Sequence, residues 1–215
     1  MYIGRIAAIG CTSEGHAAAL YRVSSRSFPH RRCVCNDTGM AVLPKRGYEE
    51  DIEKNPYIAY NCLRLTDSCA VATNGSHTDP ITEKIAHGTH PRDALISTLY
   101  GMDYEPDHLS TPRLAAVLSF DATLAYLGIV REDALLVRSF SLSKGTLFYL
   151  GTYEHNAPSD DFVDTSFNAI NADEACSYIL NRGVFADYDH PVTAAAAVAN
   201  NQKGFSLASE DVQTT

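Results

Sequence analysis

The 215-residue chain is long enough for one large domain or two small ones, and its 45% hydrophobic and 20% charged residues are typical of a folded protein. A formal net charge of −9 argues against a general binder of nucleic acids or anionic membranes, because both reward a basic protein surface. The six cysteines argue against a disulfide framework or a zinc site, since they include no paired C-x-x-C units and only Cys33 and Cys35 are closely spaced.

No stretch of the chain has the features of a targeting or membrane-spanning segment. The first five residues, MYIGR, lack the layout of a signal peptide, and no apolar run approaches the length of a membrane span. We therefore expect a cytoplasmic protein with reduced cysteines. Because we find no repeat, low-complexity tract or linker, we expect a single domain over residues 1–215.

The first part of the chain predicts two β-hairpins followed by two helices. The hairpin strands and a short strand between them are expected at 2–9, 17–23, 40–44, 57–65 and 69–73. A helix is expected over 79–87, where Ile81 and Ile85 share a face. A second helix is expected over 91–102, with Pro91 at its first position.

The second part of the chain predicts more strands and then two further helices. Four strands joined by short turns indicate one antiparallel meander over 112–119, 123–131, 134–141 and 145–152. Residues 154–170 give no clear pattern. A helix over 172–182 has Asn171 as its cap, Glu174 at the capping-box position and Gly183 as its stop. A last helix is expected from His190-Pro191 through 194–197, and the tail 209–215 is expected to fray.

The order of these elements favours an α+β fold. The strands fall into two groups with helices between and after them. Two stacked, mainly antiparallel sheets flanked by helices would bury the apolar faces of both groups.

Residues 21–29, YRVSSRSFP, form the polar cluster that is most suggestive of a ligand. Arg22 and Arg26 carry planar guanidinium groups suited to phosphate or carboxylate, and Ser25 is one of three serines beside them. An ordinary solvated turn is the alternative interpretation. Residues 1–50 carry seven basic against four acidic side chains, which fits a small anionic ligand better than a long polyanion.

Two further clusters lie at the ends of predicted strands. Tyr60 and Asn61 are adjacent in a strand and so face opposite sides, which leaves Tyr60 either as a core tyrosine or as a hydrogen-bond donor and proton relay. The segment Asn74-Gly75-Ser76-His77 ends a strand and begins a helix. Backbone N–H groups at such a position commonly bind phosphate, although an ordinary helix start has the same residues.

The remaining clusters contain carboxylates, an arginine and a histidine. Asp103 and Glu105 follow a helix C-terminus, where the helix dipole disfavours negative charge, so they are candidates for a general base or for holding a basic partner as well as for solvated charge. Arg113 adds another arginine near the start of the next strand. His190 is a ligand contact or a helix cap. The histidines show no H-x-x-x-H or H-E-x-x-H spacing, so no metal site is predicted.

Taken together, these motifs resemble the archaeal-type inosine monophosphate (IMP) cyclohydrolases. The matching stretches run in order over nearly the whole chain and include YRVSSRSFP and NGSHTD, with further matches at residues 1–5, 55–61, 102–105, 111–113 and 190–194. Residues 30–40 and the extreme C-terminus diverge, and we assign neither to the site. The resemblance implies a four-layer αββα fold of the N-terminal-nucleophile-hydrolase type.

The resemblance also implies a reaction, namely the closure of 5-formamidoimidazole-4-carboxamide ribotide (FAICAR) to IMP, the final step of purine biosynthesis. No metal or cofactor is expected, and the oligomeric state stays open, a homo-oligomer included. We expect Arg22 and Arg26 to contact the phosphate and the oxyanion, without deciding which takes which. Tyr60 would donate toward the formyl oxygen, and Glu105, with Asp103 as support or substitute, would move the carboxamide proton. Further substrate contacts are expected from Ser25, Asn61, Asn74, Gly75, Ser76, His77, Arg113 and His190.

Two alternatives come from other functional classes. An amide hydrolase of the same fold would need a freed N-terminal Cys, Ser or Thr, for example after cleavage before Cys11 or Thr12. A non-catalytic protein that binds purine ribonucleotides would retain the pocket and bind IMP without turnover.

Overall fold

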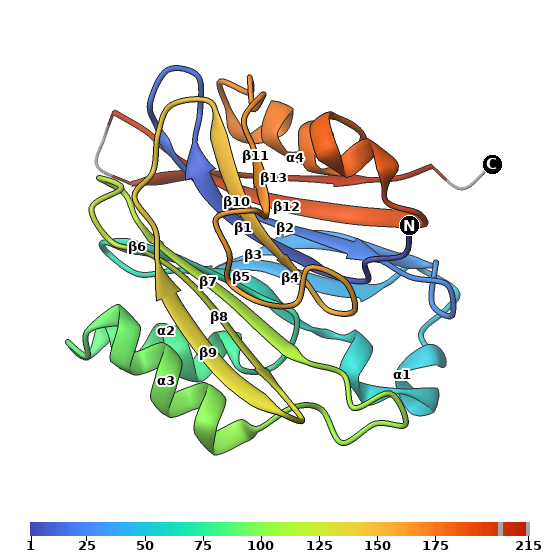
Figure 1. Cartoon of the computed structure of the whole chain (residues 1–215). Coiled ribbons are helices and arrows are strands. Elements are labelled where there is room, and N and C mark those ends of the chain that lie inside the picture. Colours follow the sequence, from blue (N-terminus) through green and yellow to red (C-terminus); the bar gives the residue numbers. More distant parts are fainter. Residues whose placement is uncertain (202–203, 214–215) are drawn as a thin grey trace.

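The computed structural model describes residues 1–201 and 204–213, which form two antiparallel sheets with helices on their outer faces (Figure 1). The six-stranded sheet has the order β11 (Val163–Asp164), β10 (Thr146–Gly151), β1 (Ile6–Cys11), β2 (Ala17–Ser24), β12 (Pro191–Ala199) and β13 (Phe205–Asp211). The seven-stranded sheet has the order β3 (Arg31–Asn36), β4 (Gly39–Pro44), β5 (Tyr60–Leu65), β6 (Cys69–Thr73), β7 (Arg113–Ser119), β8 (Ala125–Arg131) and β9 (Ala134–Ser139).

Three apolar clusters hold these layers together. One lies between the two sheets, a second between the six-stranded sheet and α4 (Ala172–Asn181), and a third between the seven-stranded sheet and the pair α2 (Thr78–Ala86) and α3 (Pro91–Met102). The remaining helical pieces are short: α1 (Asp51–Lys54) and the 3₁₀ turns Pro56–Ile58 and Gly183–Asp187. No helix within residues 1–201 and 204–213 is long and apolar enough to cross a bilayer.

The central strands of the six-stranded sheet are buried on both faces. Every residue of β1 and β2 is buried, because one face packs on the second sheet and the other face packs toward α4. A strand in such a position has a continuous apolar sequence instead of an alternating one. Within β2 the side chains still alternate in direction, so Tyr21 faces the second sheet while Leu20 faces α4.

The hairpins and the expected helices before residue 183 agree with the structure. Strands β1 and β2 pair, as do β5 and β6, and α3 begins at Pro91 as predicted. Asn171 caps α4 by accepting a hydrogen bond from the backbone N–H of Glu174 at 2.9 Å, and Gly183 has a φ of 51° just after the helix. That positive φ is the conformation in which glycine ends a helix with little strain.

The prediction of a last helix from His190-Pro191 is wrong, because residues 191–199 form strand β12. The alanine run favours a helix by intrinsic propensity, but β12 lies between β2 and β13 and pairs with both. The expected frayed tail is also wrong as far as it is described, since β13 pairs with β12 through Asp211. Residues 214–215 lie outside the described part of the chain.

The predicted four-strand meander is wrong in its last member. Strands β7, β8 and β9 are consecutive neighbours, but β10 leaves them and pairs with β1 in the other sheet. Strand β3 was not expected at all. It forms the edge of the seven-stranded sheet within the stretch 30–40 that we had set aside as divergent.

Candidate functional site

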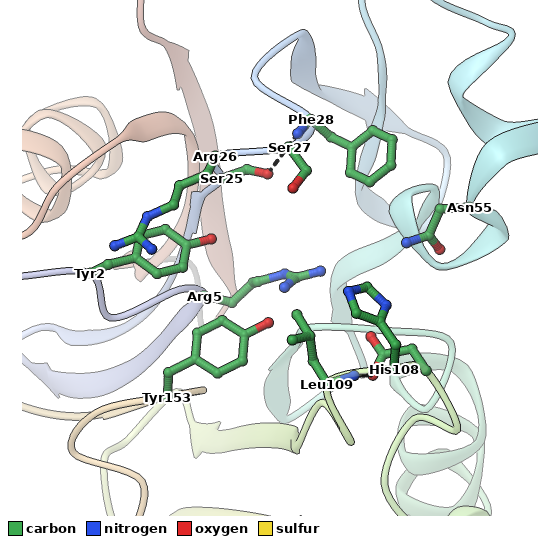
Figure 2. A pocket seen from close by; sticks show the side chains of 11 residues that line it. Tyr2, Arg5, Ser25, Arg26, Ser27, Phe28, Asn55, His108, Leu109 and Tyr153 are labelled. Carbon is green, nitrogen blue, oxygen red and sulfur yellow. Dashed lines mark hydrogen bonds between the residues drawn. The ribbon is translucent and has the colours of Figure 1, made fainter.

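A cavity of about 440 Å³ opens where five separate segments of the chain converge (Figure 2). Its volume lies in the range of pockets that enclose small molecules. The segments are the N-terminal stretch before β1, the β2–β3 loop, the start of the Pro56–Ile58 turn, the loop between α3 and β7, and the residue pair after β10. The lining residues are Tyr2, Arg5, Ser25, Arg26, Ser27, Phe28, Asn55, Asp107, His108, Leu109 and Tyr153.

Two arginines, Arg5 in the cavity lining and Arg31 bonded to the lining residue Phe28, have nitrogen atoms that are buried and unpaired. Arg31 is 1% exposed and donates through Nε to the carbonyl of Phe28 at 3.1 Å, but both of its terminal nitrogens lack a partner among the described residues. Arg5 lines the cavity, its side chain projects toward the centre in Figure 2, and its buried Nε is also unpaired. A buried, unsatisfied guanidinium is costly, so this pair marks a place for an anionic or strongly hydrogen-bonding ligand.

Two tyrosines from opposite sheets meet beside these arginines. Tyr21 of β2 and Tyr60 of β5 share a hydrogen bond of 2.6 Å between their hydroxyl oxygens. Burial raises the pKa of both phenols, although Arg31 and Arg5 act in the opposite direction on Tyr60. Both hydroxyls therefore keep their protons at neutral pH, and the pair can donate a hydrogen bond to a ligand oxygen.

Glu105 is the one buried carboxylate of the loop between α3 and β7. It is 1% exposed, and its Oε1 lies 3.4 Å from Nη1 of Arg113. Burial raises the pKa of Glu105 to about 7, while Arg5 and Arg113 limit the increase. A carboxylate that titrates near neutrality can take up and release a proton during a reaction.

A smaller cavity of about 170 Å³ joins Glu105 and Tyr60 to the predicted phosphate-binding loop. It is lined by Pro56, Tyr57, Ala59, Tyr60, Gly75, Ser76 and Glu105. A Cβ atom on Gly75 would lie 3.0 Å from Glu105 Oε1 and 3.0 Å from Arg113 Nη1. A side chain here would therefore crowd the carboxylate and the guanidinium, which would have to shift by a few tenths of an ångström.

Several of the predicted site residues are thus brought together. Ser25 and Arg26 line the larger cavity, and the Arg26 guanidinium lies 4.0 Å above the ring of Tyr2. Tyr60, Gly75, Ser76 and Glu105 line the smaller one.

His77 and Arg113 lie on the same side of Gly75 as Glu105. The Nε2 of His77 lies 2.7 Å from the carbonyl oxygen of Leu114, and burial lowers the pKa of His77 to about 3. The imidazole is therefore neutral, with Nε2 as donor and Nδ1 as an acceptor that has no partner in the described chain. Nδ1 would be 3.2 Å from a Cβ on Gly75, which puts it on the same side of the loop as Glu105.

The prediction that Arg22 contacts substrate is not supported by its position. Arg22 follows Tyr21 in β2 and so points to the opposite face of the sheet, toward α4. There its guanidinium donates to Ser24 Oγ and to four backbone carbonyls, at distances from 2.6 to 3.1 Å, of Ile179, Leu180, Phe185 and Tyr188. Arg22 fixes the end of α4 to the sheet and is not part of the cavity.

Four other predicted residues line neither of these two cavities. Asp103 is exposed, and its carboxylate accepts from the N–H of Tyr104. Asn61 bonds to Asp79 on the α2 side of β5, away from Tyr60. Asn74 is buried; its side-chain amide donates to the carbonyl of Pro112 and accepts from the N–H of Leu114, at the start of β7. His190 is exposed, and its backbone carbonyl accepts from the N–H of Ser25.

Sequence reasoning missed the two arginines with unpaired nitrogens. Arg5 lies in the matching stretch 1–5, but it precedes the first strand and is isolated from other polar residues. Arg31 lies in the stretch 30–40, which we did not assign to the site from the sequence. In the structure the side chains of β3 alternate, so that Arg31 and Cys33 are buried while Arg32 between them is exposed.

Comparison with known proteins identifies the family. The model of the protein family described as "IMP cyclohydrolase-like protein" matches residues 2–203 of this chain. A protein of Methanosphaera stadtmanae named IMP cyclohydrolase is 46% identical over 197 residues, which is 92% of this chain and 94% of that protein. Proteins of the same name are 43% identical in Methanococcus maripaludis, over 97% and 99% of the two chains, and 46% identical in Halobacterium salinarum, over 91% and 90%. The chain therefore belongs to the IMP cyclohydrolase-like family.

Proposed function

We propose that this protein catalyses the dehydrative ring closure of FAICAR to IMP. The observation that carries the proposal is the convergence of two guanidinium groups with unpaired nitrogens, from Arg5 and Arg31, on the Tyr21–Tyr60 pair and on Glu105. The near full-length relatives that bear the name IMP cyclohydrolase support the same activity.

Ring closure needs one proton acceptor and one group that stabilises an oxyanion. The carboxamide nitrogen attacks the formyl carbon, so a C–N bond forms and the formyl C=O becomes a C–O⁻. Glu105 accepts the proton that leaves the nitrogen. Arg31, Arg5 and the hydroxyl of Tyr60 donate to the oxygen as its charge grows. Preorganised donors of this kind act strongly where water is excluded.

Loss of water completes the reaction. Glu105 returns its proton to the oxygen, which gives a carbinolamine. The C–O bond then breaks, and the hydroxyl takes up a proton and leaves as water. The former formamide nitrogen loses one proton in the same step, which gives the C=N bond of IMP. Both reacting groups belong to one imidazole, so the site needs only to hold the rotamer in which they meet.

The ribotide would lie with its ring between Glu105 and Tyr60 and its phosphate at the mouth of the larger cavity. Ser25, Arg26 and Ser27 line that mouth and offer hydroxyl and guanidinium donors. The alternating layers of helix, sheet, sheet and helix support an N-terminal-nucleophile-hydrolase-like classification of the fold, which we propose as the finer description.

Amide hydrolysis, the activity of other enzymes with that fold, has less support. It would need a new N-terminus before Cys11 or Thr12. Cys11 is the last residue of β1, Thr12 is fully buried, and cleavage there would remove a strand that pairs with both β2 and β10.

The test is an absorbance assay of purified protein with FAICAR. We expect conversion to IMP without added metal, and a loss of kcat on the order of 100–1,000-fold in Arg31→Met and in Tyr60→Phe, the usual cost of removing one oxyanion donor. Arg138→Met is the matched control, because Arg138 is an exposed arginine on β9 that pairs with Asp160. Tight binding of IMP with no turnover would favour a non-catalytic nucleotide-binding protein instead.

A further inference from the structure

We infer that Asp107 is a positioning residue, whose carboxylate closes the loop between α3 and β7 into a clasp that holds Glu105 at the cavity. This inference rests on the proposed function, in which Glu105 is the proton acceptor. Asp107 itself takes no part in the chemical steps. It acts through its hydrogen bonds to Thr111 and to the backbone of the loop.

The clasp is a closed set of hydrogen bonds. The Oδ1 of Asp107 accepts from the N–H of Leu109 at 3.1 Å and of Thr111 at 2.9 Å, and its Oδ2 accepts from the Thr111 hydroxyl at 2.7 Å. The N–H of Glu105 donates to the Thr111 carbonyl at 2.9 Å, and the N–H of Asp107 donates to the Glu105 carbonyl at 2.8 Å. The N–H of Glu105 is therefore fixed by Thr111 and its carbonyl by Asp107, and the Asp107 carboxylate links these two residues.

The backbone of this loop adopts conformations that need outside support. Asp103, at its start, has a φ of 55° and a ψ of −174°, a region that is normally restricted to glycine. Ser110, near its end, has a φ of 46°. Arg113 holds the first of these positions by donating through Nε to the carbonyl of Asp103 at 2.8 Å. Asp107 bonds across the second one, so the clasp and Arg113 together maintain the loop.

Asp107 also contributes negative charge beside Glu105. The cationic groups that face Glu105 are Arg5, Arg113 and Arg31, and all three lower its pKa, whereas burial and the Asp107 carboxylate raise it. His77, on the same side of Gly75 as Glu105, stays neutral and adds no charge. Removing the Asp107 charge while keeping its shape should therefore lower the pKa of Glu105.

A second aspartate provides a matched control. Asp121 closes the β7–β8 turn with the same chemistry: its Oδ1 accepts from the N–H of Thr123 at 3.0 Å and from the hydroxyls of Thr123 and Ser119 at 2.8 and 2.6 Å. It lines neither cavity. Asp121→Ala and Asp121→Asn thus report the cost of untying an Asp–Thr turn without touching the clasp.

The experiment measures kcat, KM and the pH–rate profile of Asp107→Ala, Asp107→Asn and the two Asp121 variants with FAICAR. In Asp107→Ala we expect kcat to fall on the order of 10–100-fold with KM little changed, because a shift of about 1 Å in a catalytic group has this effect. Asp107→Asn should restore most of kcat, since the amide oxygen accepts the same two N–H bonds, and its acidic limb should move to lower pH. The Asp121 variants should change neither quantity.

Three results would overturn the inference. They are an unchanged kcat and acidic limb in both Asp107 variants, a loss in Asp107→Ala that Asp107→Asn does not recover, and an equal loss in Asp121→Ala. If Asp107→Ala does not fold, Thr111→Val replaces it. This variant loses the hydroxyl bond to Asp107 and the 3.5 Å contact with the Tyr153 hydroxyl, and it should also lower kcat.

A titration separates this inference from the proposed function. The ¹³C-carboxyl resonance of Glu105, assigned through Glu105→Gln, reports its pKa in the ligand-free protein. A lower pKa in Asp107→Asn than in the parent supports the placement of the Asp107 charge beside Glu105 even if FAICAR is not converted, whereas an unchanged pKa contradicts that placement whatever the turnover.

Discussion

Two ionisable side chains near the cavity, those of Arg31 and Glu105, are held in surroundings that raise the free energy of their charged forms. Burial lowers the pKa of Arg31 and raises that of Glu105 to about 7. Groups of this kind reduce stability in the absence of ligand and are kept where they do chemistry. At the residue scale, the same side chains that we assign to the reaction should therefore be those whose removal does not destabilise the protein.

Glu105→Gln tests this directly. The native state keeps the Glu105 proton up to pH about 7, whereas the unfolded chain releases it near 4.5. Stability contributed by this group is therefore lost as the pH rises from about 4.5 to 7, and stays lost above that. We expect Glu105→Gln to abolish turnover and to unfold at higher denaturant concentration, with a gain of roughly 1–3 kcal/mol at pH 8 that vanishes near pH 4.

Urea unfolding of both proteins at pH 4 to 8 measures this difference. If Glu105→Gln were equally or less stable at pH 8, the attraction of Arg5 and Arg113 for the ionised carboxylate would be at least as large as the free-energy cost of burying it.

At the scale of elements, strand β2 carries two polar side chains for two different tasks. Tyr21 faces the other sheet and bonds to Tyr60, while Arg22 bonds to four carbonyls at the end of α4 and in the turn after it. Buried carbonyls that lose their donor are costly, and the charged donor makes these bonds strong. Arg22 is thus part of the packing of α4, and its value lies in stability.

Arg22→Met and Arg31→Met should have opposite effects. Arg22→Met leaves four carbonyls without their donor, so we expect it to lower the free energy of unfolding by about 3–5 kcal/mol and to leave kcat near normal in the folded protein. Arg31→Met removes a cation whose terminal nitrogens are unpaired, so stability should change by about 1 kcal/mol or less while kcat falls. Chemical denaturation and assays below the unfolding temperature separate the two. A strong loss of kcat in folded Arg22→Met would return Arg22 to the site.

Alternation within strands explains what the sequence could and could not predict about the site. Tyr60 and Asn61 were correctly expected on opposite faces of β5, because adjacent strand residues always diverge. The same rule applied to Tyr21 and Arg22 would have removed Arg22 from the site. Arg31 was missed for a different reason: β3 was not recognised, since its six residues include two arginines and an asparagine. No local pattern shows that an edge strand brings one of its arginines beside a tyrosine of a strand two positions away.

For the whole molecule, the two sheets pack through small side chains. The layer between them includes Ala7 of β1, Ala19 of β2, Ala72 of β6, Ala116 of β7 and Ala195 of β12. Short side chains let the sheets approach closely in their middle. The same composition hid β12 from prediction, because an alanine-rich segment favours a helix until pairing with β2 and β13 decides otherwise.

Enlarging this layer should be costly. Ala195→Leu adds three carbon atoms to a fully buried position, and we expect the free energy of unfolding to fall by about 1–3 kcal/mol through overpacking. Ala134→Leu, at the half-buried start of the edge strand β9, is the matched control and should change stability little. Differential scanning calorimetry compares the two variants. Equal melting temperatures would mean that the layer between the sheets can accommodate a leucine at position 195 without strain.

The alternation of side chains along β2 limits where residues can be inserted into or deleted from this hairpin. Residues 17, 19, 21 and 23 point to the second sheet, whereas 18 and 20 point to α4 together with Arg22. Deleting a single residue inside this strand would exchange the two sets, so that a guanidinium entered the interface and a phenol met the helix. We therefore expect the protein to tolerate insertions and deletions at the hairpin tip, residues 12–16, where a change in length does not reverse the faces of the two strands.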